Sequence, residues 1–279
     1  MTQNATKIRW LLLLLIYLSC LIAYLDRMNM SVCAPMIMEH FGIDKIRFGM
    51  SMSAFAIAYT MMQIPGGLLS ERFGIRLTGA VALLCWSLFT FVTPLAGSFM
   101  AFVAIRFLFG LGEGPLFPNN GAFLTRWFGP HEKALSSSIM ISGAFVGPAL
   151  APPLAVWVLN HWGWQAVFYA FGVDGLILAP VWYLFARNSP AEHPSVNQAE
   201  LRLIGHGSAA TEPASRKQTV PWKRFLRSSQ FWALGIQYFF VTYFIFLFLT
   251  WVPLYLLEAR GMSLNAMGVA AAAPWVAVC

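Results

Sequence analysis

The apolar runs of this 279-residue sequence limit what it can fold into more than any other feature. Several of them approach 20 residues, the length that an α-helix needs to cross the hydrocarbon core of a bilayer. Hydrophobic residues make up 58% of the sequence and charged residues only 10%, which is not the balance of a soluble domain. The sequence therefore predicts an all-α, polytopic membrane protein.

The spacing of the apolar runs predicts seven complete spans and the start of an eighth. We expect spans over about residues 10–36, 48–69, 77–94, 99–117, 134–159, 166–185, 231–257 and from 266 to the last residue. The start resembles a signal peptide, but its apolar run continues to Asp26, so we predict an uncleaved first helix. The eighth run has about fourteen residues, too few to cross, so we expect a C-terminally truncated chain.

One long polar segment separates these spans into two sets. It covers residues 187–229 and is rich in serine, proline and charge. Six spans, a long basic linker and a second set of spans are the plan of a two-bundle transporter. We therefore predict a complete N-terminal six-helix bundle (residues 1–186), a cytoplasmic linker (187–229) and the start of a C-terminal bundle (230–279).

The distribution of Lys and Arg predicts the orientation. With the N-terminus inside, 13 of the 18 basic residues fall on the inner side, seven of them in the long linker. Such an asymmetry is typical of cytoplasmic loops. It explains the net charge of +7 and gives no reason to expect a nucleic-acid partner. We therefore predict a cytoplasmic N-terminus.

Two predicted spans carry charged pairs at membrane depth. Arg106 and Glu113 in the fourth span are seven residues apart, so they share one helix face about 10 Å apart along its axis. Asp26 and Arg27 lie in the first span, with Asp26 roughly 24 Å from its inner end, while Arg106 lies roughly 10 Å from the outer end of its span. These depths overlap, so we expect Asp26 to pair with Arg106.

Ionisable groups at this depth are costly and by default mark a substrate or proton pathway. A network that only holds helices together is the alternative. With all four groups charged the cluster is neutral. If Glu113 or Asp26 takes a proton, a surplus arginine charge remains that an anion can neutralise, so proton and anion binding favour each other. Asp174 in the sixth span has no basic partner at its depth, and we expect it to serve helix packing or to face water.

Other chemistries find little support in the sequence. We see no Ser-His-Asp set and no phosphate loop, and the four cysteines and five histidines lack metal-ligand spacing. The glycines of GLGEG follow no strand, so they do not indicate a nucleotide-binding loop. We predict neither an enzyme nor a metal or other cofactor.

The sequence GGLLSERFGIR, between the second and third spans, resembles the signature loop of the major facilitator superfamily. A glutamate stands where that family usually has aspartate, and only one arginine ends the motif. The resemblance implies that the glycines allow close helix contact, while the charges bridge helix ends on the cytoplasmic side. The matching residues are Gly66, Gly67, Glu71, Arg72, Gly74 and Arg76.

Together with AYLDRMNMSV, QIPGG and RFLFGLGEGPLFP, the chain resembles the anion:cation symporter branch of that superfamily, which includes bacterial transporters of hexonates, hexuronates, glucarate and phthalate. The resemblance covers essentially the whole chain. It implies a multi-pass protein of the bacterial inner membrane, surrounded by lipid and monomeric when full length. The implied site residues are the proton carriers Asp26 and Glu113, the anion-binding or gating Arg27 and Arg106, and the site-lining Tyr24 and Tyr59.

One departure from the branch bears on the substrate. Sugar-acid members often carry a polar glutamine in the fifth span, where this chain has Gly143 and Ala144, which argues against a polyhydroxylated substrate. The leading prediction is proton-coupled symport of a small organic carboxylate anion such as a sugar acid. Exchange of an organic phosphate or a dicarboxylate is one alternative. A non-transporting remnant or a transporter-like sensor is another.

Overall fold

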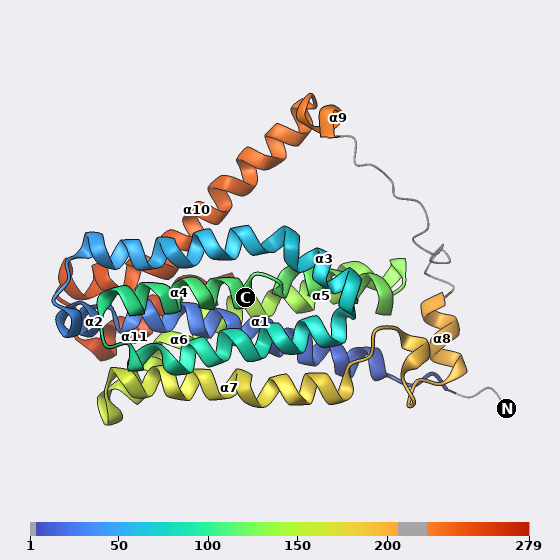
Figure 1. The fold of residues 1–279 in the computed structure, drawn as a ribbon, viewed down its shortest axis with the longest axis horizontal. Helices are drawn as coiled ribbons and strands as arrows, with labels where there is room; N and C mark the ends of the chain where they lie inside the picture. Colours follow the sequence, from blue (N-terminus) through green and yellow to red (C-terminus); the bar gives the residue numbers. More distant parts are fainter. Residues whose placement is uncertain (1–3, 206–221, 279) are drawn as a thin grey trace.

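The computed structural model describes residues 4–205 and 222–278, and its regular structure there is helical throughout. Most of the helices lie side by side in an elongated bundle (Figure 1). Within the described residues, six helical stretches are long and apolar enough to cross a membrane. The predicted all-α membrane fold is confirmed. The elements are α1 (Ile8–Val32), α2 (Ala34–Phe41), α3 (Lys45–Val92), η1 (Thr93–Leu95), α4 (Phe99–Glu113), α5 (Leu116–Trp127), α6 (Pro130–Trp162), α7 (Trp164–Phe185), η2 (Pro190–Glu192), α8 (Gln198–Gly205), α9 (Trp222–Leu226), α10 (Ser229–Glu258) and α11 (Leu264–Val276).

Helix α3 contains both the second and the third predicted spans, because it turns back on itself within the signature loop (Figure 1). The turn lies at Gly74, whose φ of 84° is a conformation that residues with a side chain rarely adopt. The side chain of Asn188 fills the space that a Cβ on Gly74 would need. Its Oδ1 accepts a hydrogen bond from the backbone N–H of Arg76 at 3.1 Å. The glycine is therefore required both for the turn and for the close approach.

The fourth predicted span and the polar loop after it were placed wrongly. The chain breaks its helix near Gly114, restarts as α5 and continues to Trp127, ten residues beyond the predicted end at 117. Only Phe128 and Gly129 separate α5 from α6. Helix α6 begins at Pro130, a position where the missing N–H of proline costs nothing. Arg126 and Glu132, which fall between the predicted spans, lie in the last turn of α5 and the first turn of α6.

Helices α1 and α6 form a close contact along small residues, as the sequence SGAFVGPALAPPL indicates. A Cβ on Gly143 would lie 2.6 Å from the carbonyl oxygen of Tyr17, and a Cβ on Gly147 would lie 2.6 Å from that of Leu21. Small residues let two helix backbones approach each other in a membrane. This stretch of α6 thus serves the contact between α1 and α6.

Helix α10 contacts the bundle through its C-terminal half, and its other half stands away from it (Figure 1). Its buried residues are Leu249, Thr250, Pro253 and Leu254, whereas many large apolar side chains from Phe231 to Phe244 are exposed. The hydroxyl of Ser31 on α1 donates to the carbonyl oxygen of Thr250 at 2.6 Å. An ion pair between Lys45 and Glu258 joins the start of α3 to the end of α10. These contacts hold α10 to one end of the bundle.

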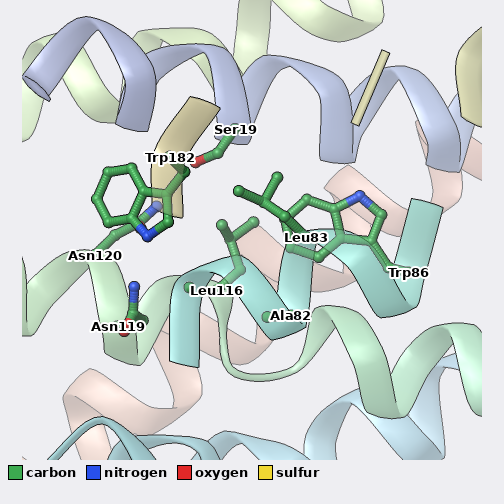
Figure 2. Close-up of a pocket in the computed structure, with 9 residues that line it drawn as sticks. Ser19, Ala82, Leu83, Trp86, Leu116, Asn119, Asn120 and Trp182 are labelled. Atoms are coloured by element: carbon green, nitrogen blue, oxygen red, sulfur yellow. The ribbon is translucent and has the colours of Figure 1, made fainter. Parts of the chain in front are cut away.

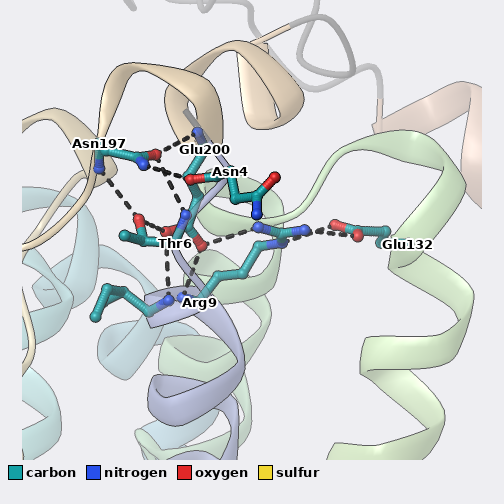
Figure 3. Close-up of polar contacts among 7 residues, drawn as sticks. Asn4, Thr6, Arg9, Glu132, Asn197 and Glu200 are labelled. Carbon is teal, nitrogen blue, oxygen red and sulfur yellow. Dashed lines mark hydrogen bonds and ion pairs between the residues drawn. The ribbon is translucent and has the colours of Figure 1, made fainter. Parts of the chain in front are cut away.

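The start of the predicted linker packs against the N-terminal end of α1 (Figure 3). Glu200 on α8 is fully buried, and its carboxylate accepts the backbone N–H groups of Ile8 and Arg9 at 3.3 and 3.2 Å. These donors have no partner within their own helix, so Glu200 caps α1 from a distant part of the chain. The side-chain hydroxyl of Thr6 also donates to Glu200, at 2.5 Å.

Arg9 connects this cap to α6. Its Nη1 lies 2.9 Å from Glu200, while its Nε and Nη2 donate to the two oxygens of Glu132, each at 3.0 Å. The α1 start, the α6 start and α8 are thus joined by one guanidinium group. Residues 206–221 lie outside the described residues, and the predicted domain boundaries at 186 and 229 stay predictions.

The Glu200→Gln variant is expected to be less stable than the parent chain in thermal unfolding in detergent. The amide keeps the shape of the side chain but removes the charge that holds Arg9 and the α1 amides, and a buried charged hydrogen bond is worth about 1.5–3 kcal/mol. Glu192→Gln is the matched control, because Glu192 is exposed and its side chain bonds, within the described residues, only to Ser189 nearby in sequence. Equal melting temperatures of the two variants would contradict the capping role of Glu200.

Candidate functional site

The four predicted membrane charges all lie in the interior of the bundle. Asp26, Arg106 and Glu113 are fully buried, and Arg27 is 5% exposed. Arg106 and Glu113 both face inward from α4, as their spacing of two helical turns predicts. The sequence was therefore right that these side chains converge from α1 and α4.

A close contact between α3 and α4 brings two aromatic residues into this cluster. A Cβ on Gly110 would lie 2.5 Å from the carbonyl oxygen of Phe55, so α4 approaches α3 more closely than a larger residue would allow. Phe55 and Tyr59 thereby come to lie beside Arg27, and Phe55 also beside Arg106. The ring of Phe246 on α10 stacks on Phe55 with centroids 6.4 Å apart. Helix α10 thus reaches the edge of the cluster.

Arg27 forms an ion pair with Glu113. Its Nε donates to Oε1 of Glu113 at 2.7 Å, and its Nη2 lies against the same oxygen. The guanidinium carbon lies 4.5 Å from the ring centroid of Tyr24 and 4.6 Å from that of Tyr59. The two tyrosines that were predicted to line the site therefore flank Arg27 and present their ring faces to it.

Asp26 and Arg106 do not form the ion pair that their depths suggested. Neither oxygen of Asp26 and none of the three guanidinium nitrogens of Arg106 has a hydrogen-bond partner among the described residues. Arg106 lies instead over the ring of Phe109, at 4.3 Å from its centroid. Depth alone could not settle the pairing. Neighbouring helix residues point about 100° apart, so only one of Asp26 and Arg27 can face a given partner.

The cluster includes a polar residue that the sequence reasoning missed. Asn29 lies on α1 three residues after Asp26, is fully buried, and neither its amide nitrogen nor its oxygen has a partner among the described residues. Residues three apart on a helix share a face. A search for polar residues at helical spacing from Asp26 would have found it. Buried polar atoms without partners are rare and call for an explanation.

The signature loop holds helix ends together, but only some of its residues take part. Gly66 packs against Pro115, where a Cβ would lie 2.6 Å from the proline Cα. Arg76 donates to the carbonyl oxygen of Tyr183 on α7 at 2.7 Å and lies over its ring. This bridge matches the predicted role for Arg76. Among the described residues, Glu71 and Arg72 are exposed and form no ion pair. A Cβ on Gly67 would make only an ordinary contact, 3.6 Å from Pro118.

A small cavity in the bundle is not suited to an organic anion. It lies between α1, α3, α5 and α7, and Ser19, Asn119, Asn120 and Trp182 are among the residues around it (Figure 2). Its volume is about 10 Å³, which is the space of roughly one water molecule. Asn119 accepts a hydrogen bond from Ser70 at 3.0 Å, so part of its polar wall is already satisfied. The charged cluster remains the candidate site.

Residues 16–279 match the family model described as Major Facilitator Superfamily. The chain is 34% identical to the probable galactarate/D-glucarate transporter GudP of Bacillus subtilis (strain 168), over 96% of this chain and 62% of the relative. It is also 34% identical to the probable sulfoacetate transporter SauU of Cupriavidus necator, over 99% of this chain and 63% of the relative. The chain thus spans less than two thirds of the length of these relatives.

Solved structures agree on the fold. A bacterial homolog of the human lysosomal transporter Spinster, in an inward-facing and unoccupied conformation, matches 97% of this chain and 60% of that chain, with a TM-score of 0.78 and 21% sequence identity. The matched family is one of membrane transporters and not of enzymes. The chain is a multi-pass membrane protein that belongs to the Major Facilitator Superfamily, and its relatives there include transporters of organic anions.

Proposed function

We propose that this protein serves proton-coupled symport of a small organic carboxylate anion, with sugar acids as the leading class. The observation that carries the proposal is the buried ion pair between Arg27 and Glu113, with Asp26 and Arg106 unpartnered beside it. A structural network would be expected to pair all four groups, because an uncompensated buried charge is costly. An acid and an arginine without partners are better suited to binding a proton and an anion.

Glu113 and a substrate carboxylate compete for the same arginine in this proposal. A guanidinium group binds any carboxylate through its planar set of N–H donors. When an anion takes the place of Glu113 on Arg27, Glu113 stays buried without its partner. An unpaired buried carboxylate is costly, and taking a proton removes that cost. Binding of the anion therefore favours binding of a proton, and the two move together.

Arg106 and Asp26 give the site a second anion-binding group and a second proton-accepting group. Arg106 has all its donors free, so it can accept the second anionic or polar end of a substrate held at Arg27. Asp26 supplies a second acid that can take a proton when a negative charge arrives. The rings of Tyr24 and Tyr59 fix the orientation of Arg27 from two sides. Asn29 offers a neutral donor and acceptor on the same face of α1 as Asp26.

The names of the relatives support a small anion but do not select one. GudP is described as a probable transporter of galactarate or D-glucarate, and SauU of sulfoacetate. Gly143 and Gly147 pack against the backbone of α1, so this stretch of α6 serves helix contact. We propose a cytoplasmic N-terminus and inner-membrane location on the charge distribution. Exchange of an organic phosphate or a dicarboxylate, the runner-up, explains the two acids Asp26 and Glu113 less well than proton-coupled symport does.

The Arg27→Lys variant is expected to bind the substrate anion about tenfold more weakly, because a lysine keeps the charge but loses the paired donors, at a cost of about 1.4 kcal/mol. Glucarate binding is measured on a chimera that joins this chain to the remaining C-terminal spans of GudP. Arg260→Lys is the control, since Arg260 is exposed beyond the end of α10. Unchanged affinity in Arg27→Lys would remove this residue from the site.

A further inference from the structure

Two neighbouring asparagines are buried in the apolar interior of the bundle. Asn119 and Asn120 follow each other on α5, and each is only 2% exposed. The amide group of an asparagine carries two N–H donors and an acceptor oxygen, and a buried polar atom without a partner is costly. Two such amide groups side by side therefore need several hydrogen-bond partners inside the bundle.

Each amide group forms one hydrogen bond to a neighbouring helix. Asn119 accepts from the hydroxyl of Ser70 on α3 through its Oδ1 at 3.0 Å, and Asn120 donates from its Nδ2 to the sulfur of Cys20 on α1 at 3.4 Å. Among the described residues, the other atom of each amide, Nδ2 of Asn119 and Oδ1 of Asn120, forms no hydrogen bond. The pair therefore keeps a free donor and a free acceptor.

Both asparagines line the small cavity that Figure 2 shows. The Nδ2 of Asn119 lies at its wall, since a Cβ on Gly79, another lining residue, would be 2.8 Å from that atom. The hydroxyl of Ser19 lines the cavity too, and it already donates within α1 at 2.7 Å, so its lone pairs are left to accept. In Figure 2 these polar side chains lie on the same side of the view, around Trp182.

We propose that this cavity binds one water molecule, held by Asn119, Asn120 and Ser19. The Nδ2 of Asn119 donates to the water, and the water donates to the Oδ1 of Asn120 and to the hydroxyl oxygen of Ser19. A cation could not accept from Asn119, and a simple anion could not donate to Asn120. Among the described residues that line the cavity, none is charged. Its volume of about 10 Å³ and its three polar partners suit a buried water.

This water joins α1 to α5 close to the charged cluster. Cys20, which contacts Asn120, precedes Arg27 by seven residues and therefore lies two helical turns from it on the same face of α1. Helix α5 follows directly on α4, which ends at Glu113. The water thus links the two segments that carry the partners of the buried ion pair. Its binding requires neither a substrate nor a coupling ion, so a test of the water is independent of the proposed transport function.

X-ray footprinting of the purified chain in detergent tests for the water directly. The X-ray pulse converts bound water to hydroxyl radicals, which oxidise the adjacent side chains even where bulk solvent does not reach. Trp182 lines the cavity and is only 2% exposed, and we expect mass spectrometry to find it oxidised. Met267 is the control within the same sample. It is fully buried on α11, away from the cavity, and should stay unmodified although methionine is readily oxidised.

The Ala82→Val variant distinguishes a cavity that holds water from an empty one. Ala82 lines the cavity, so the added methyl groups take the place of the water. Trp182 should then lose its oxidation, and the melting temperature should fall by about 2–4 °C because two buried amide groups lose a partner. In an empty cavity the same methyl groups would fill a void and raise the melting temperature. Ala80→Val adds them at a buried position of α3 outside the cavity and should keep the oxidation of Trp182.

Three results would overturn the proposed water site. The first is oxidation of Trp182 in the parent chain that does not exceed that of Met267, a comparison that requires no variant to fold. The second is a folded Ala82→Val variant that keeps the oxidation of Trp182 or melts at a higher temperature than the parent chain. The third is loss of the oxidation in folded Ala80→Val, because a water in this cavity does not depend on that position.

Discussion

The Glu113→Gln variant is expected to lose substrate accumulation driven by a pH gradient while still exchanging substrate across the membrane. The amide resembles the protonated carboxyl, so Arg27 stays available to the anion but no proton is carried. With one proton per substrate monoanion, a gradient of one pH unit supports about a tenfold accumulation. In proteoliposomes containing the GudP chimera, the parent should approach this value and the variant should stop at equal concentrations.

Asp174→Asn serves as the matched control for this experiment. Asp174 also lies in a membrane helix, but it is exposed on α7 and takes no part in the ion pair of Arg27 and Glu113. We expect its amide variant to accumulate substrate like the parent. Full accumulation by Glu113→Gln would show that Glu113 is not a coupling group. Loss of exchange as well would show that it acts in binding or folding.

The Gly66→Ala variant is expected to lose a large part of its folding stability. A Cβ at this position would lie 2.6 Å from the Cα of Pro115, which is backbone and cannot move without shifting α5. Overpacking of this kind costs about 1–3 kcal/mol. Thermal unfolding in detergent and the yield of monodisperse protein measure the effect.

Gly67→Ala is the control within the same motif. A Cβ on Gly67 would meet Pro118 at 3.6 Å, an ordinary van der Waals contact. Both glycines are helical, and alanine favours a helix by about 1 kcal/mol over glycine at either position. Gly67→Ala should therefore match or exceed the parent in stability. If the two variants behave alike, close packing at Gly66 is not what the motif requires.

Much of the fold could be predicted from hydropathy, because an apolar run of about 20 residues has few alternatives to a span. The positions at which the helices end could not be predicted from hydropathy. The predicted spans left residues 118–133 between them, but Arg126 and Glu132 in that stretch lie at helix ends, where charged residues are as well solvated as in a loop. Only the proline and glycine at 129–130 marked the true break. The family motif implied that Gly74 allows close helix contact, but its positive φ was not predicted.

The four charged residues of the cluster could be predicted from the sequence, but which of them form an ion pair could not. The spacing of Arg106 and Glu113 is local and follows from helix geometry. The choice of Arg27 over Arg106 as the partner of Glu113 depends on how α1 is rotated against α4. That rotation is set by contacts such as Gly143 and Gly147 with α1, which join parts of the chain far apart in sequence.

The cap that Glu200 places on α1 has a consequence for the order of biosynthesis. The capping carboxylate is 191 residues downstream of the Arg9 amide that it accepts. A chain made from its N-terminus must therefore insert its first six spans before this bond can form. During that interval the first amides of α1 depend on water or lipid headgroups for partners. The contacts that join Arg9, Glu132 and Glu200 can therefore form only after the helices that precede Glu200 have been synthesised.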